Sequence, residues 1–129
     1  MSEPRFLSVE DVIAIHAEML AAHGGQEGIR DRGLLESAVA MPTQTFDGVY
    51  VHDDLFAMAS AYAFHVAQNQ PFVDGNKRAA IGAALVFLEI NDVALREATE
   101  ELYDAMIGLA ERRMSKSGLA ALFRTLIEG

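Results

Sequence analysis

The chain has 129 residues, 51% of them hydrophobic, with a formal net charge of −9, no cysteine and no tryptophan. This length suits one domain over residues 1–129, which would bury roughly two-thirds of the surface that the unfolded chain exposes. The lack of cysteine excludes disulfides and thiolate metal sites, and the negative charge argues against direct nucleic-acid binding. With no long apolar run and no export signal at its start, the sequence predicts a cytoplasmic protein without a membrane span.

The first predicted helix begins at a capping box. Ser8 is the expected cap, and Asp11 reaches back to it from three positions on. Apolar residues at helical spacing continue to about His23, before Gly24-Gly25 ends the helix. His16 lies seven residues before His23 on one face, but a zinc site needs further ligands that the neighbouring sequence lacks. We therefore interpret both histidines as polar positions at the edge of a helix.

The next segment predicts a short helix and then a turn-rich region. Asp31 is the expected cap of the helix, and Met41-Pro42 closes it. Hydrophobic residues near 43–52 surround Asp47-Gly48, a common pair in hairpin turns. This region is expected to form either a small two-stranded flap or an ordered loop.

Two long apolar segments predict the centre of the fold. Residues 55–67 and 78–90 are apolar on nearly every side, as expected of helices buried within a bundle. Asp53 or Asp54 would cap the first of them. His65 falls inside it and is expected to be a packed or hydrogen-bonded core histidine.

The last third of the chain predicts two more helices. Thr99 is the expected cap of a helix that runs through Glu111, and Ser117 that of a helix through Ile127. Together with the earlier segments, this gives an all-α fold: a helical bundle with a possible small β-hairpin.

A polar run lies between the two central helices: Gln70-Pro71-Phe72-Val73-Asp74-Gly75-Asn76-Lys77-Arg78. Pro71 should end the first helix near Asn69, and it biases Gln70 towards an extended conformation. Asp74-Gly75 supplies a turn, and Asn76 is a plausible cap for the second helix. Free N–H groups at a helix start, beside two cations and a carboxylate, predict a pocket for an anion such as phosphate.

Each polar residue of this run has a predicted functional role and a simpler structural alternative. Asp74 could hold a Mg²⁺ ion that bridges two phosphates, or could only shape the turn. Asn76 could donate its amide to a phosphate oxygen, or could only cap the helix. Lys77 and Arg78 would neutralise charge on a transferred phosphoryl group; the macrodipole disfavours cations at a helix start, which favours a functional role. Phe72 would hold the loop against the core.

Residues 70–78 resemble the signature of the Fic/Doc superfamily, His-x-Phe-x-acid-small-Asn-Gly/Lys-Arg. Four further segments resemble its short Doc (death-on-curing) branch: 8–23, 24–31, 33–38 and 85–88. The resemblance covers essentially the whole chain. It implies an all-helical Fic/Doc domain, ATP and Mg²⁺ as cofactors, and a toxin of a bacterial toxin–antitoxin module. It also implies that Asp74 is the metal-associated acid, and that the phosphate binders are Gly75, Asn76, Lys77 and Arg78.

Lys77 stands where nucleotide-transferring Fic enzymes usually have glycine. In the Doc branch this lysine accompanies ATP bound in reverse, so that the γ-phosphate moves to a threonine of elongation factor Tu and translation stops. The resemblance therefore implies a protein kinase-like phosphotransferase. The alternatives are a Fic-type AMP transferase acting on a protein hydroxyl and a catalytically dead module that binds a nucleotide or a partner.

One position departs from the family signature, because the catalytic histidine is replaced by Gln70. A glutamine amide cannot take a proton near neutral pH, and losing a general base typically lowers the rate by about 10²–10⁴-fold. We therefore expect this chain to be inactive or weak. The replacement is either natural or one made so that a lethal protein can be expressed.

Fic proteins that restrain themselves carry Ser/Thr-x-x-x-Glu-Gly/Asn, which this chain lacks. The nearest match, residues 125–129, has one residue too few between its threonine and its glutamate. We therefore expect inhibition by a separate antitoxin, whose amphipathic helical segment lies in an apolar groove. Four adaptable side chains are candidates for lining it: Met41, Phe46, Met58 and Met114.

Overall fold

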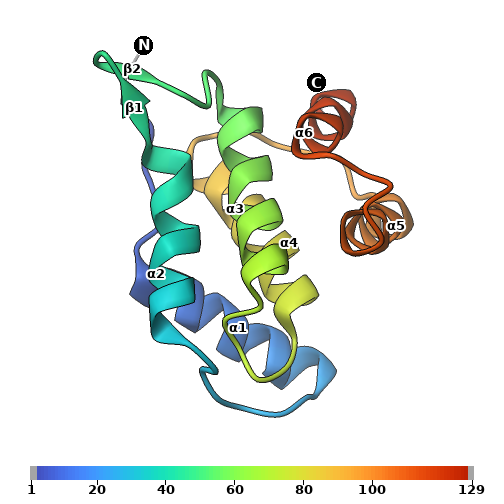
Figure 1. Cartoon of the computed structure of the whole chain (residues 1–129). Helices are drawn as coiled ribbons and strands as arrows, with labels where there is room; N and C mark the ends of the chain where they lie inside the picture. Colours follow the sequence, from blue (N-terminus) through green and yellow to red (C-terminus); the bar gives the residue numbers. More distant parts are fainter. Residues whose placement is uncertain (1–2, 128–129) are drawn as a thin grey trace.

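The computed structural model describes residues 3–127, so Glu128 and Gly129, the last two residues of the compared segment 125–129, lie outside it. The described chain folds into α-helices with one small hairpin (Figure 1). The elements run in the order α1 (Val9–His23), α2 (Arg32–Ala40), the 3₁₀ turn η1 (Met41–Thr43), β1 (Thr45–Phe46), β2 (Val49–Tyr50), α3 (Leu55–Asn69), α4 (Asn76–Ile90), α5 (Thr99–Ala110) and α6 (Lys116–Thr125). The predicted all-α class and the hairpin are both confirmed. None of the helices in residues 3–127 has the length and apolar character that a membrane crossing requires.

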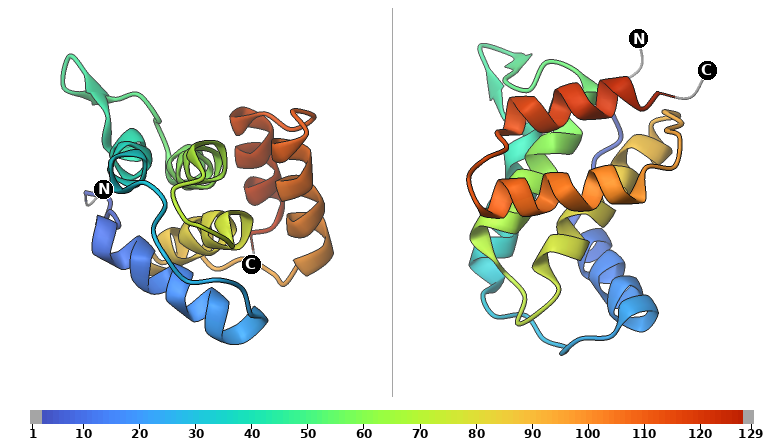
Figure 2. Two further views of the ribbon diagram at one scale, coloured as in Figure 1. Left: turned by 60° about the horizontal axis from the view of Figure 1, so that its bottom comes forward. Right: turned by 90° about the vertical axis from the view of Figure 1, so that its right-hand side faces the viewer.

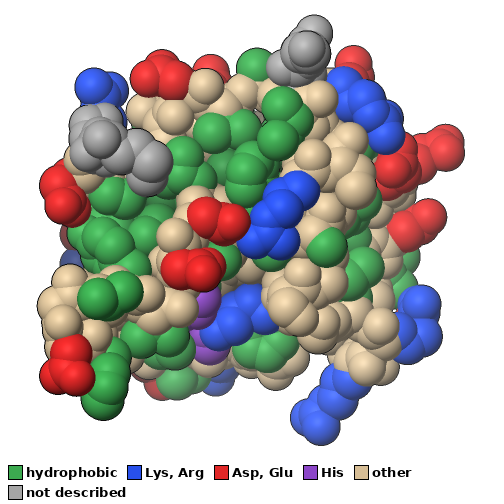
Figure 3. Space-filling model, turned by 90° about the horizontal axis from the view of Figure 1, so that it is seen from above, with side chains coloured by type: hydrophobic (Ala, Val, Ile, Leu, Met, Phe, Trp, Pro, Cys, Tyr) green, Lys and Arg blue, Asp and Glu red, His purple; other side chains and the backbone are tan. Residues whose placement is uncertain are grey.

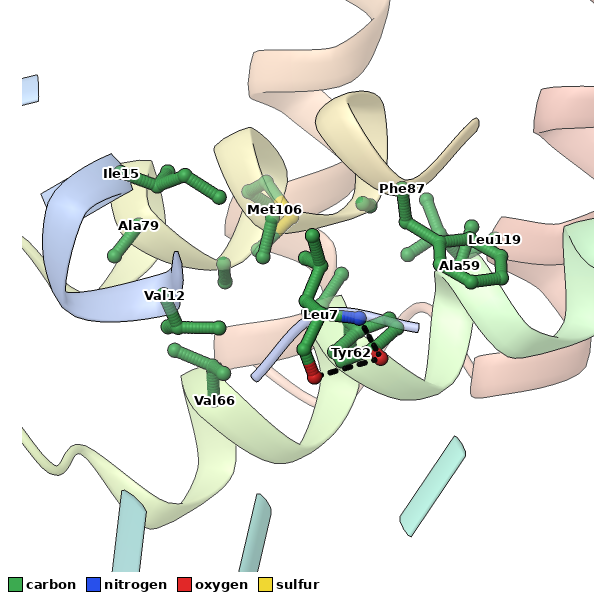
Figure 4. Close-up of a cluster of buried hydrophobic side chains, with 14 of the residues drawn as sticks. Leu7, Val12, Ile15, Ala59, Tyr62, Val66, Ala79, Phe87, Met106 and Leu119 are labelled. Carbon is green, nitrogen blue, oxygen red and sulfur yellow. Dashed lines mark hydrogen bonds between the residues drawn. The ribbon is translucent and has the colours of Figure 1, made fainter. Parts of the chain in front are cut away.

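Helices α3 and α4 form the centre of the bundle. They run side by side, with α1 and α2 on one side and the pair α5 and α6 on the other (Figures 1 and 2). The buried rings of Tyr62, Phe87 and Phe123 lie where these layers meet. The hydroxyl of Tyr62 accepts a 2.9 Å hydrogen bond from the N–H of Leu7, which joins the N-terminal segment to the core (Figure 4).

Side-chain caps fix the starts of the first helices as predicted. Ser8 and Asp11 form the capping box of α1, and Asp31 accepts the Leu34 N–H at the start of α2. Of the two candidates for α3, Asp54 is the cap, since its carboxylate accepts the Ala57 N–H at 2.7 Å.

The caps predicted for the last two helices were wrong. Helix α5 begins at Thr99 itself, after Ala98, without a side-chain cap. Helix α6 is capped by Ser115, whose hydroxyl accepts the Gly118 N–H at 3.0 Å, and Ser117 lies inside the first turn. Either serine suits a cap chemically. The tight turn after α5, where Arg112 has φ 62°, brings Ser115 to that place.

The hairpin pairs Thr45 with Tyr50 and Phe46 with Val49. Asp47 and Gly48 both have positive φ, 51° and 78°, as a two-residue turn of this hand requires. Phe46 at its tip is 75% exposed. Met58, in contrast, is 2% exposed within the core, so it cannot line an antitoxin groove as predicted.

Charged side chains are interspersed on the face in Figure 3. The Lys and Arg side chains there lie apart, among acidic and hydrophobic ones, and form no continuous basic surface.

A cluster of three nitrogen-bearing side chains joins α6 to α3. The ammonium of Lys116 donates to Nε2 of His52 at 3.0 Å and to Nε2 of His65 at 3.2 Å. His65 is thus hydrogen-bonded, as predicted, but it is only partly buried rather than a core residue. Burial and then the charge of Lys116 lower the pKa of both histidines, that of His65 to about 4.

Acid should therefore destabilise the fold through His65. Unfolded histidine has a pKa near 6.5, so between about pH 6.5 and 4 the unfolded chain binds more protons, and stability falls as the pH falls. Because His65 is only partly buried, we expect a loss of about 1–2 kcal/mol rather than the full shift. Urea unfolding at pH 7 and 4.5 measures it: His65→Gln should lessen the pH dependence, whereas His23→Gln, at the exposed end of α1, should not. Equal pH dependence in wild type and His65→Gln would contradict the assignment.

Candidate functional site

The loop between α3 and α4 begins with a left-handed residue. Gln70 has φ 46° and ψ 57°, and its N–H donates to the carbonyl of Val66. The predicted extended conformation was wrong, because closing the C-terminus of α3 outweighs the preference that Pro71 imposes. The guanidinium of Arg30 then binds the carbonyls of Asn69 and Gln70, at 2.9 and 2.8 Å.

Helix α4 begins with Gly75, not Asn76, in the capping position. Gly75 has φ 76°, and no side chain caps the helix, so the prediction of Asn76 as cap was wrong. The Asn76 amide instead turns back: its oxygen accepts the N–H of Phe72 at 2.9 Å, and its nitrogen donates to the Phe72 carbonyl at 3.0 Å. These two hydrogen bonds close the loop. The N–H groups of the first turn of α4 are left without partners in the helix.

Both carboxylate oxygens of Asp74 accept backbone N–H groups. Oδ2 accepts from Gln26 at 3.0 Å and Oδ1 from Gly75 at 2.9 Å, and these bonds lower the pKa of Asp74. A Cβ atom at Gly25 would come within 3.0 Å of Oδ2. The loop after α1 therefore fixes the carboxylate, a role that the sequence reading missed because it took Gly24-Gly25 only as the end of a helix.

His16 of α1 packs against the same loop. Its ring is 5% exposed and stacks on Phe72, with centroids 3.8 Å apart and planes 3° from parallel. Its Nε2 donates to the carbonyl of Asp74 at 2.8 Å. The prediction of His16 as a polar edge position was wrong, although the sequence held a signal, since His16 follows the core residue Val12 by four positions. Phe72 is 1% exposed and holds the loop to the core, as predicted.

The backbone of residues 24–31 also pairs with the loop. The N–H groups of Arg30 and Asp31 both donate to the carbonyl of Pro71, at 2.7 and 3.0 Å. The N–H of Val73 donates to the carbonyl of Gly28 at 3.0 Å. Two segments about forty residues apart in the sequence thus form one rigid support.

A cavity of about 450 Å³ opens between this loop and α5. The loop provides one wall, with Gln70 and all five other predicted site residues: Asp74, Gly75, Asn76, Lys77 and Arg78. The structure thus brings together in one cavity every residue that the sequence assigned to catalysis, phosphate binding or metal binding. The remaining lining includes Gln68 of α3 and Tyr103, Leu109 and Ala110 of α5, which sequence reasoning did not connect with the site.

The donor set allows a Mg²⁺ ion but not a metal site made by protein alone. Residues 3–127 contain no group of three or more His, Cys, Asp or Glu side chains arranged to hold a metal. Mg²⁺, however, is usually bound by one or two carboxylates together with substrate phosphates and water. Asp74 fits that pattern, because its two N–H partners leave further lone pairs on each oxygen.

Comparisons with known proteins agree with this geometry. The profile of the Fic/DOC family matches residues 6–88. Toxin Doc of Mycolicibacterium smegmatis is 43% identical over 90 residues, which cover 70% of this chain and 67% of the relative. Protein kinase doc of Escherichia phage P1 is 33% identical over 122 residues, 95% of each chain. The match takes in the loop, its support in residues 24–31 and the surrounding helices, and the chain belongs to the Fic/DOC family, in its Doc branch.

Proposed function

We propose that this protein is a Doc-type toxin with the machinery of an ATP-dependent phosphotransferase, impaired by Gln70. The observation that carries the proposal is the joining of Asp74, Lys77, Arg78 and the open start of α4 in one cavity. A hydroxyl of a translation factor, elongation factor Tu, is the proposed acceptor. The similarity to proteins named Toxin Doc and Protein kinase doc supports this function. Action on a translation factor would place the protein in the cytoplasm.

Each side chain then has a defined task. The N–H groups at the start of α4, with Lys77 and Arg78, would hold phosphate oxygens and stabilise charge that develops during transfer. Asp74 would hold Mg²⁺, which neutralises phosphate charge when bound. Because the amide of Asn76 already binds Phe72 on both sides, its proposed part is to keep the cradle in shape as well as to contact phosphate.

Gln70 occupies the place of the general base. Its amide can orient an attacking hydroxyl by hydrogen bonding, but it cannot accept the proton that the hydroxyl loses. The proposal therefore separates binding from chemistry: ATP should bind to this chain, while transfer should be slow or absent.

Two other functions compete with this one. A Fic-type AMP transferase would move the α-phosphate with its nucleoside, and Lys77 argues against it because its bulk replaces the glycine of those enzymes. A binding-only module would keep the cavity and perform no transfer even with a histidine at position 70. Control by a separate antitoxin is also proposed, and the exposed hydrophobic side chains near the loop, Val73 and Ile29, are available for such a contact.

Labelling ATP separately on its α- and γ-phosphates distinguishes these functions. With Gln70→His and purified elongation factor Tu, label should pass to the protein from the γ position only. Transfer from the α position would replace the proposal with AMP transfer. If neither label is transferred while ATP still binds, the binding-only function is the correct one.

A further inference from the structure

The cavity beside the loop has two walls of unlike chemistry. The loop wall carries Lys77 and Arg78, the single carboxylate of Asp74 and the N–H groups that begin α4, and is cationic on balance. Helix α5 contributes Tyr103, Leu109 and Ala110 to the lining, which we call the apolar wall, and α3 contributes Ala67 and Gln68. A ligand that fills both halves needs an anionic end and an apolar end.

Tyr103 stands out on the apolar wall. It is 60% exposed, whereas the core face of α5 is formed by other residues, among them Leu102 and Met106. Within residues 3–127 no aromatic ring pairs with it. Tyr103 is absent from the hydrophobic core found within residues 3–127, and its side chain lines the cavity.

Size and charge select the class of ligand. A volume of about 450 Å³ falls within the range of roughly 300–1,000 Å³ typical of small-molecule and cofactor sites. The cationic loop wall lies in a protein of net charge −9, so anionic groups are attracted locally to that wall and repelled elsewhere. A nucleoside polyphosphate has the matching form, with phosphates at one end and a flat aromatic base at the other.

We propose that Tyr103 is the platform on which the nucleobase of the bound nucleotide stacks. The proposal rests on the proposed function, since it assumes that the loop wall takes the phosphates. Stacking on an aromatic side chain strengthens binding through the π face that every base has, and the exposed Ala110 lies on the same wall. Tyr103 thus makes the site prefer a nucleotide over an inorganic polyphosphate.

Calorimetric titration of the full chain with ATP and with inorganic tripolyphosphate, both in excess Mg²⁺, tests the assignment. Wild type should bind ATP more tightly than tripolyphosphate. Tyr103→Ala should weaken ATP binding by about 5- to 150-fold and leave tripolyphosphate binding unchanged. Tyr103→Phe should retain the affinity for ATP, because the ring remains. Lys77→Ala should weaken both ligands.

Phe46→Ala is the matched control, since it removes an exposed aromatic ring of the hairpin that does not line this cavity. It should change neither affinity. Unchanged ATP affinity in Tyr103→Ala, or tripolyphosphate binding as tight as that of ATP in wild type, would overturn the platform and leave the proposed function standing. A parallel loss of both ligands in Tyr103→Ala would also overturn it. Failure of wild type to bind either ligand would overturn the proposed function and the platform together.

Discussion

Replacing Gln70 with histidine should raise the rate of γ-phosphoryl transfer by about 10²–10⁴-fold, the usual contribution of a general base. The backbone at this position is held by Val66 and Arg30, whose bonds do not involve the side chain. Histidine also tolerates the left-handed conformation that Gln70 adopts. The new imidazole should therefore enter the same place without moving the loop.

Initial rates of label transfer from γ-labelled ATP, for wild type and Gln70→His, measure this gain. Affinity for ATP should change little between the two proteins. Gln68→His is the matched control, because it places an imidazole on another residue that lines the same cavity, and it should produce no comparable rise. Tight ATP binding in Gln70→His alone would instead mean that position 70 shapes the pocket itself.

Replacing Phe72 with alanine should lower the free energy of unfolding by about 3–5 kcal/mol, the range for a fully buried phenylalanine. The ring is 1% exposed and stacks on His16, so its loss leaves a cavity under the loop and removes a direct contact of the imidazole. Urea unfolding at neutral pH gives the value. The loop should also lose order, because the buried ring anchors residue 72 to the core and the main-chain bonds of Asn76 fix the loop only relative to that residue.

Phe46→Ala provides the comparison for this prediction, because that ring is 75% exposed and should cost less than about 0.5 kcal/mol. A double-mutant cycle with His16→Ala isolates the stacking: the two losses should add up to more than the loss in the double variant. A cost below about 1 kcal/mol for Phe72→Ala would show that the loop holds its place without the ring.

Local signals in the sequence predicted most of the helices and the hairpin. Ser8, Asp31 and Asp54 act as caps because each short polar side chain stands directly before an apolar periodic segment, where it can accept a free N–H of the first turn. The same rule was wrong at Ser117, where two serines two residues apart were equally suited and the preceding turn decided between them. Local sequence patterns therefore predicted the type of each element more reliably than the residue at which it begins.

The sequence identified the loop residues of the candidate site, but neither the residues that support the loop nor those of α5 that line the cavity. Residues 70–78 are adjacent in sequence, so their combined chemistry can be read directly. The bond from Gln26 to Asp74 and the stacking of His16 on Phe72 join residues more than forty positions apart. The local sequence pattern of neither segment predicts such a contact. Tyr103 was missed for the same reason, since it reaches the cavity only after α5 packs beside α3.

The bonds between residues 24–31 and the loop are made mostly by main-chain atoms on the side of the earlier segment. The side chain at position 26 takes no part in the bond of its N–H to Asp74, and Gly28 offers only its carbonyl to Val73. Exchange of side chains such as that of Gln26 should therefore be harmless to the loop. An inserted or deleted residue would shift each N–H and carbonyl away from its partner. Over evolutionary time this connection should vary in composition more readily than in length, except at Gly25, Gly28 and Arg30, where a new side chain would meet the loop or lose its bonds.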